Sequence, residues 1–180
     1  AKSAIITESL KVRKGIQIVP KDWAGQKTLG ELQDLHINCY SDASNTVYET
    51  IKAFTKEIAV PDFNIMDLQV IAPVKTRGDA CVRKLNEIMQ EMYNPLTEED
   101  KKKPGIHEIK VFQKKYVTFL RVGDKVINKK NNYKIKDING DTTQIFNGSQ
   151  GVVTEIRSYD SIVVDFAYIG KVVITKDALS

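Results

Sequence analysis

The chain has 180 residues, of which 42% are hydrophobic and 28% are charged, and its formal net charge at pH 7 is +4. This composition excludes a disordered, collagen-like or disulfide-stapled chain, and it suffices for the hydrophobic core of one or two small domains. No apolar run approaches the roughly 18 residues of a membrane-spanning helix, and the N-terminus lacks a signal-peptide pattern. We therefore expect a cytoplasmic protein with no membrane partner.

The first 60 residues predict two helices and two extended segments. In chain order these are a short helix over residues 4–12, an extended segment over 16–19, a strand over 35–40 and an amphipathic helix over 45–58. The last of these is the clearest, because Val47, Ile51 and Phe54 recur at the spacing of one helix face. Possible N-caps precede it at residues 41–44, and Pro61 stops it.

The next stretch predicts a buried strand and a second helix. Residues 67–72 are mostly apolar without helical spacing, and residues 81–92 carry apolar side chains at helical spacing. The alternation of strands and helices is typical of a parallel α/β sheet, in which ligands bind at the carboxyl ends of the strands. The turn that follows the predicted strand would place Arg77 at this end of the sheet, where it could contact a bound phosphate. A surface arginine on a connecting turn is the plainer interpretation.

A charged linker over residues 97–105 separates this part from a β-rich part. Four strands are expected there, and strands of this length with polar turns indicate a small closed barrel. Their ranges are 125–128, 149–156, 162–166 and 171–174. The predicted fold class is therefore α/β, with a partial parallel sheet over residues 1–105, followed by a small all-β barrel over residues 106–180.

Positive charge is concentrated in one segment. Residues 107–140 carry nine basic and three acidic side chains, whereas residues 1–106 carry fifteen of each. Such an excess suits a polyanion partner, because Lys and Arg release counterions from a phosphate chain. A solvated surface that keeps the protein in solution explains the same charge equally well.

This segment supplies candidate contacts to single-stranded DNA. Basic side chains neutralise phosphates, amides hydrogen-bond to the backbone or to base edges, and aromatic rings stack on bases. The candidates are Arg121, Lys125, Lys129, Lys130, Asn131, Asn132, Tyr133, Lys134 and Asn147. Phe146 could also offer a ring, but the turn that follows it favours a place in the barrel core. For Tyr133, stacking and a structural role are about equally supported.

Motifs for catalysis are missing from the sequence. There is no G-x-x-x-x-G-K-[S/T] phosphate loop, so this chain alone is not expected to hydrolyse ATP. No acidic cluster has nuclease-type metal spacing, and the two histidines support no Ser/His or Cys/His constellation. Cys39 and Cys81 lack C-x-x-C spacing and are expected to be buried free thiols rather than zinc ligands. We predict no catalytic residue, metal or cofactor in this chain.

Several stretches resemble, in the same order, motifs of the RecD-like and TraI-like superfamily 1 (5'-3') DNA helicases. They are Gln69–Val74, Arg77-Gly78, Leu85–Gln90 with Asn94-Pro95, Phe119–Val126, Asn131–Tyr133 and Phe146–Gly151. The resemblance covers residues 69–179. It implies a fragment of the second RecA-like motor domain with its inserted Src-homology-3-like barrel, as in an exodeoxyribonuclease V alpha subunit, and hence a role in DNA repair or recombination.

The resemblance also implies which partners the fragment would have. It would contribute single-stranded DNA contacts and one side of an ATP cleft, with Arg77 as the candidate residue of that cleft. ATP and Mg²⁺ would be cofactors of the full-length parent, whose remaining motor-domain portions belong to the same polypeptide. Ser149 and Gln150 replace an acid and an aliphatic residue of the family pattern, which excludes a role for negative charge there. Ser149 can still cap the turn by bonding to nearby amides.

A non-enzymatic adaptor is the alternative. Its barrel would dock an extended segment of a protein partner, with the α/β part as a platform. Such grooves typically use several aromatic residues and acidic loops, whereas the loops here are basic. In either case, an open edge of a truncated sheet could pair two chains into a dimer.

Overall fold

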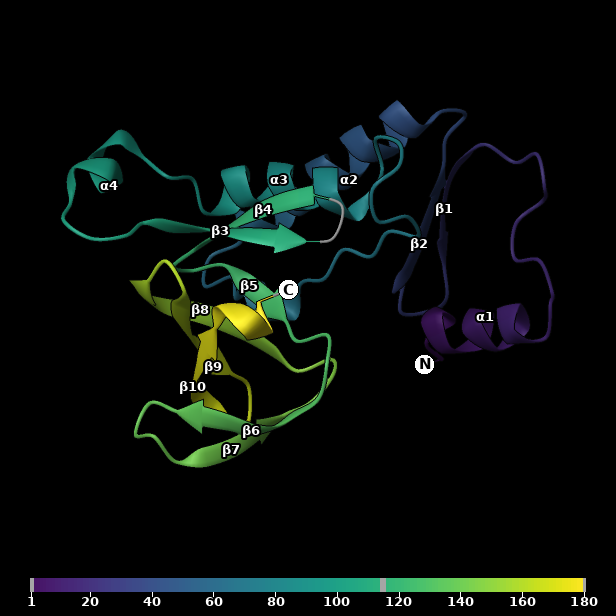
Figure 1. The fold of residues 1–180 in the computed structure, drawn as a ribbon. Coiled ribbons are helices and arrows are strands. Elements are labelled where there is room, and N and C mark those ends of the chain that lie inside the picture. Colours follow the sequence, from purple (N-terminus) through teal and green to yellow (C-terminus); the bar gives the residue numbers. More distant parts are fainter. Residues whose placement is uncertain (1, 114–115, 180) are drawn as a thin grey trace.

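A computed structural model describes residues 2–113 and 116–179 (Figure 1). Its helices are α1 (Ala4–Arg13), α2 (Ala43–Ile58), α3 (Val82–Tyr93) and α4 (Glu98–Lys102), with 3-10 turns η1 (Ile65–Asp67) and η2 (Lys176–Ala178). Its strands are β1 (Gly25–Leu29), β2 (Leu35–Cys39), β3 (Glu108–Gln113), β4 (Tyr116–Arg121), β5 (Lys125–Ile127), β6 (Asn132–Asp137), β7 (Thr142–Ile145), β8 (Gln150–Ser158), β9 (Ser161–Phe166) and β10 (Gly170–Thr175).

All strand pairing in the described residues is antiparallel. The largest sheet has six strands in the order β5-β8-β9-β10-β6-β7, and β1-β2 and β3-β4 form separate hairpins. The chain is thus a mixed α and β protein with a β-rich C-terminal part. No parallel sheet is present in the described part of residues 1–105, because the only strands there are the hairpin partners β1 and β2.

One hydrophobic core fills the β-rich part. Strand β9 illustrates its origin, since Ile162, Val164 and Phe166 alternate along the strand and all point into the same cluster. Every strand from β6 to β10 contributes to this cluster, and β3 adds Ile109 and Val111. The six-stranded sheet therefore curves around one core, and the β3-β4 hairpin lies over it (Figure 1).

The expected barrel is only partly closed. The four predicted strands are confirmed as β5, β8, β9 and β10. In the described residues no ladder joins the two outer strands β5 and β7, so the six-stranded sheet keeps two edges. The β3-β4 hairpin completes the enclosure through side-chain packing instead. We call this unit of six-stranded sheet and hairpin the β-module.

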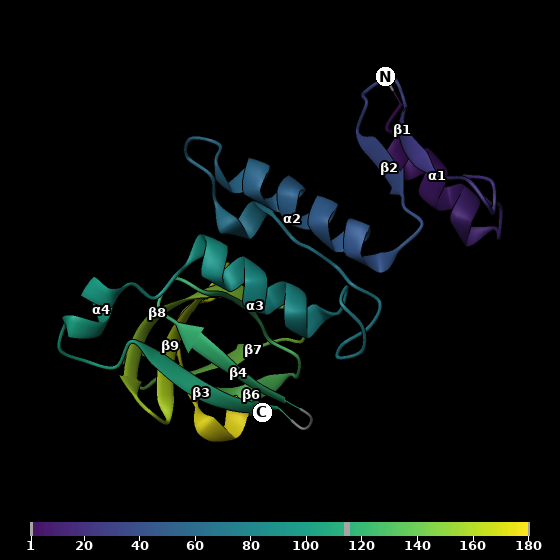
Figure 2. The same cartoon turned by 90° about the horizontal axis from the view of Figure 1, so that it is seen from above.

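The predicted helices are confirmed as α1, α2 and α3, and the predicted strand over 35–40 as β2. Asp42 caps α2, because its side chain accepts a hydrogen bond from the backbone nitrogen of Asn45. The charged linker contains the short helix α4, which begins with a capping box between Thr97 and Asp100. Helix α3 lies between α2 and the β-module (Figure 2).

Two predicted extended elements are wrong. Residues 16–19 form an irregular bend, and residues 67–72 form η1 and an irregular stretch in place of a buried strand. Ile71 is 84% exposed. The apolar run lacked helical spacing, but a buried strand also needs neighbouring strands to take up its backbone hydrogen bonds. In the described residues no strand lies beside it.

The N-terminal elements form a separate small unit. The Ser3 hydroxyl and the Ala4 backbone nitrogen both donate to the carboxylate of Asp34, which ties α1 to the end of the β1-β2 hairpin. A glycine is required at position 30, because a Cβ there would lie 2.6 Å from the Cβ of Ala4. Among the described residues, no helix is both long and apolar enough to cross a bilayer.

Candidate nucleic-acid interface

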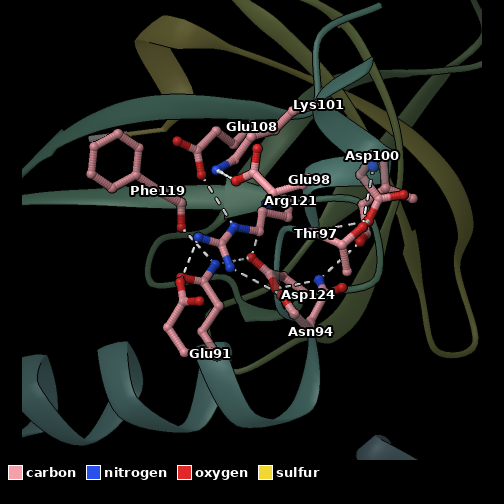
Figure 3. Close-up of polar contacts among 12 residues, drawn as sticks. Glu91, Asn94, Thr97, Glu98, Asp100, Lys101, Glu108, Phe119, Arg121 and Asp124 are labelled. Carbon is pink, nitrogen blue, oxygen red and sulfur yellow. Dashed lines mark hydrogen bonds and ion pairs between the residues drawn. The ribbon is translucent and has the colours of Figure 1, made fainter. Parts of the chain in front are cut away.

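A buried carboxylate joins α3 to the β-module. Asp124 is only 7% exposed, and it accepts hydrogen bonds from the side-chain amides of Gln90 and Asn94 and from the backbone nitrogen of Arg121 (Figure 3). The Asn94 amide also donates to the carbonyl of Val122 at 2.9 Å. Burial raises the pKa of Asp124 and outweighs the hydrogen bonds, which lower it. We call this set of contacts the α3 junction.

Arg121 belongs to the same junction. Its side chain is 11% exposed, and its guanidinium group reaches Glu91 at 2.6 Å and Glu108 at 3.1 Å (Figure 3). A third bond goes to the carbonyl of Asn94. Burial opposes the charge of Arg121, but the two carboxylates outweigh burial and raise its pKa. The guanidinium predicted to contact a phosphate is therefore engaged inside the protein.

Lys125 is also engaged internally. Its ammonium group donates to the carbonyls of Ile65, Met66 and Leu68, at 3.1, 3.2 and 2.8 Å. These bonds use all three donors of a lysine and attach η1 to strand β5. Burial lowers the pKa of Lys125, and the nearby charge of Asp67 partly offsets this effect.

The stretches that resemble the helicase motifs thus meet in space. Gln90 and Asn94 from one stretch contact Asp124 from another, and Gln150 donates to Gln69 at 3.0 Å. Sequence reasoning missed the role of Asp124. The available signal was a Gly-Asp pair directly before the predicted strand over 125–128, since a carboxylate in such a turn can accept from local backbone amides.

The remaining candidates gather on one exposed surface. It consists of the segment after β5, the start of β6 and the turn before β8, and its members are Lys129, Lys130, Asn131, Tyr133, Lys134, Phe146 and Asn147. We call it the loop face. No acidic residue occurs in the sequence between Asp124 and Asp137, so this segment carries a net positive charge.

Hydrogen bonds hold the loop face in shape. Asn131 accepts from the backbone nitrogen of Asn147 at 2.7 Å and donates to the hydroxyl of Tyr133 at 2.9 Å. Asn128 donates to the carbonyls of Lys130 and Phe146. The two loops are thereby cross-linked, although they lie about 16 positions apart in the sequence. Asn131 acts as a connector, so its amide is partly committed within the protein.

Two further polar candidates stabilise turns. The side-chain oxygen of Asn132 accepts from the backbone nitrogen of Lys134, and Asn132 is half-buried. Ser149 accepts from the backbone nitrogen of Phe146 at 3.2 Å, which confirms the expected cap. These contacts fix the backbone from which the lysines project.

The aromatic pair is the most distinctive part of the loop face. The rings of Tyr133 and Phe146 lie edge to face, with centroids 6.2 Å apart and planes at 75°. Tyr133 is 59% exposed and Phe146 is 44% exposed. The predicted place of Phe146 in the core is wrong, because Ile145 takes the inward position next to it and Phe146 faces outward.

Arg77 does not belong to the loop face. It is exposed in the irregular segment before α3, next to Gly78, whose φ is +75°. Its predicted place at the carboxyl end of a buried strand is wrong, since residues 68–72 form no strand. Cys81 is a buried free thiol at the start of α3, whereas Cys39 is free but only half-buried. In residues 2–113 and 116–179, no group of three or more His, Cys, Asp or Glu side chains could hold a metal ion.

The loop face therefore combines lysines, ordered amides and two exposed rings, which are the groups that bind phosphates and unpaired bases. The α3 junction has a structural role, because it fixes the position of the β-module relative to α3. Comparisons with protein-family models, with curated proteins and with solved structures found no match to this chain.

Proposed function

We propose that the loop face binds single-stranded DNA and that the chain is a segment of a RecD-like DNA helicase. The observation that carries the proposal is the exposed Tyr133–Phe146 pair, flanked by lysines on an otherwise polar surface. Single exposed apolar side chains are common on protein surfaces, but these two rings lie together, and contiguous apolar patches mark interaction sites. Lysines beside them favour a partner with both negative charge and flat apolar groups, and unpaired nucleic acid has both.

The expected affinity is modest and depends on salt. Base stacking on an aromatic ring contributes about 1–3 kcal/mol per base, and each neutralised phosphate steepens the salt dependence. The loop face lacks a set of side chains that could read base edges in a fixed order, because Asn131 and Asn132 are occupied with the turn. Little sequence preference follows, which suits a protein that moves along a strand.

The motor role rests on the sequence resemblance and on one further feature. Val70, Ile71 and Val74 are exposed apolar side chains in the irregular segment that holds Arg77. We propose that other parts of the helicase pack against this segment, complete a RecA-like sheet and bring Arg77 to the ATP cleft. ATP and Mg²⁺ would bind there, and this chain alone would not hydrolyse ATP. In a longer protein that has ATPase activity, Arg77→Ala should lower kcat while leaving DNA affinity unchanged.

The DNA-binding proposal is tested by fluorescence anisotropy of a labelled oligothymidine at several salt concentrations. Lys130→Glu with Lys134→Glu reverses two charges of the loop face. The matched control, Lys56→Glu with Lys171→Glu, makes the same change in net charge at exposed lysines on α2 and β10. We expect the first pair to weaken binding at least tenfold and to flatten the salt slope, and the control pair to change affinity less than twofold.

Tyr133→Ala should weaken binding five- to a hundredfold with little change in the salt slope, because it removes stacking and leaves the charges in place. If the wild type binds DNA and neither set of substitutions changes its affinity, the DNA-binding site lies outside the loop face. No binding at low salt would overturn the proposal, and the adaptor would then be the better interpretation.

A further inference from the structure

A large cavity opens beside the loop face. It lies between the β3-β4 hairpin, the segment after β5 and η2, and its volume is about 690 Å³. Binding sites for small molecules commonly have volumes of about 300–1,000 Å³. The cavity is therefore large enough for a group the size of a nucleoside.

The inner wall of the cavity is apolar. It is formed by core side chains of the β-module, among them Val111, Ile145, Ile162 and Phe166. The hydroxyls of Tyr116 and Thr118 also line the cavity, whereas the side-chain amides of Asn128 and Asn132 are engaged in the neighbouring turns. An apolar wall with a few polar groups suits a flat heteroaromatic ring whose edge carries donors and acceptors.

The cavity opening is continuous with the loop face. Lys129, Lys130, Asn131 and Asn132 line the cavity and directly precede Tyr133 in the chain. The lining contains four basic side chains and a single carboxylate, that of Asp177. The field at the opening therefore favours a ligand that carries negative charge outside the cavity.

We infer that the cavity receives one unstacked base of the bound single strand. This inference rests on the proposed function and specifies how the same surface holds its ligand. The phosphates on either side of the base remain at the lysines of the loop face, while the base leaves the stack and enters the apolar space. A single strand allows this, because no partner strand has to be unpaired and only stacking is lost.

A base analogue reports this arrangement directly. 2-Aminopurine, placed within an oligothymidine, fluoresces more strongly when it is unstacked, and acrylamide quenches it only where solvent reaches the ring. We expect binding to raise its fluorescence at one position of the oligonucleotide and to lower its quenching constant at least threefold there. Positions further along the strand should stay as accessible as in free DNA.

Two variants separate the cavity from the exposed rings. Ala178→Phe places a ring at an exposed residue that lines the cavity, and Ala167→Phe makes the same change in the exposed turn between β9 and β10, which does not line it. We expect Ala178→Phe to restore quenching and Ala167→Phe to leave protection intact. Because the lysines are unchanged, the salt slope should be the same for both variants.

The outcomes distinguish the two proposals. DNA binding in which 2-aminopurine stays fully quenchable would overturn the cavity inference and leave the proposed function standing. Equal protection in both phenylalanine variants, lost in Tyr133→Ala, would assign the protection to the exposed rings and also overturn the inference. No binding of the oligonucleotide at low salt would overturn both.

Discussion

The side-chain amide of Asn94, at the end of α3, donates to the buried carboxylate of Asp124 at 2.8 Å, across 30 residues of sequence. The same amide bonds to the carbonyl of Val122, and a Cβ at Gly123 would lie 3.3 Å from its nitrogen. The glycine, the acid and the amide thus fit one another closely.

Removal of the acid should destabilise the protein more than removal of the amide. Asp124→Ala leaves the backbone nitrogen of Arg121 without this acceptor and removes one of the two acceptors of Gln90 and of Asn94, and an unsatisfied buried group costs about 1–3 kcal/mol. We expect a loss of about 3–5 kcal/mol for Asp124→Ala and about 1–2 kcal/mol for Asn94→Ala, from urea unfolding. Asp165→Ala, at an exposed position of β9, should change stability by less than about 0.5 kcal/mol. Equal effects of Asp124→Ala and Asp165→Ala would contradict the structural role of the junction.

Two carboxylates should titrate on opposite sides of the ordinary value of 3.8. Folding raises the pKa of Asp124 through burial, and it lowers the pKa of Asp100 to about 2 through hydrogen bonds from Lys103 and Thr97. In an NMR titration of the carboxyl carbons, Asp100 should therefore still be ionised at pH 3, where Asp124 is already protonated. The reverse order would show that one of the two environments differs from the structure.

These shifts also set the direction of the pH dependence. The folded chain holds the proton of Asp124 more tightly than the unfolded chain, so its contribution to stability is fullest below pH 3.8 and falls as the pH rises through the folded pKa. Asp100 contributes stability above pH 3.8 that is lost as the pH falls toward 2. Asp100→Asn should remove the second effect and leave the first.

Lys125→Met should loosen a distant segment and leave DNA binding unchanged. The substitution keeps most of the apolar stem but removes the donor for the carbonyls of Ile65, Met66 and Leu68. Hydrogen exchange over residues 65–71 should become at least tenfold faster, and stability should fall by about 1–3 kcal/mol. Lys171→Met on β10 is the control. If Lys125→Met keeps its fold but loses much of its DNA affinity, then Lys125 contacts a phosphate, as predicted from the sequence.

Two glycines should respond differently to substitution by alanine. A Cβ at Gly151 would lie 2.6 Å from the carbonyl oxygen of Asp165 and 2.8 Å from a methyl carbon of Val164, so β8 and β9 would have to separate. Gly140 has open space around it, and only its φ of +89° resists a side chain. We expect thermal unfolding to show a loss of about 2–4 kcal/mol for Gly151→Ala and about 1–2 kcal/mol for Gly140→Ala. Equal losses would mean that β8 shifts without cost.

Local pattern predicted much of the fold and less of the site. The alternation in Ile162, Val164 and Phe166 is enough to predict β9 and its inward face, and the spacing of Val47 to Ile58 is enough to predict α2. By contrast, Lys125 and Lys130 are equivalent in the sequence, since both are lysines in a basic run. They differ because the carbonyls of η1 surround one of them, and those carbonyls are 57–60 residues away.

Ile71 and Phe146 show the same limit for burial. The run that contains Ile71 is as apolar as a core strand, but it is exposed because in the described residues no strand lies beside it. Phe146 follows Ile145 at the end of β7, where burial alternates so that Thr143 is half-buried, Ile145 is buried and Phe146 is exposed. Two adjacent apolar residues fit either alternation, so the sequence does not decide which of them faces the core.

The α3 junction restricts the movement of the loop face relative to the helices. The β-module is attached to α3 through Asp124 and Arg121 and to η1 through Lys125. These three contacts restrict rotation of the β-module relative to the helices. If the loop face binds single-stranded DNA as proposed, its orientation relative to α3 is fixed before binding, and the conformational entropy lost on association falls mainly on the nucleic acid.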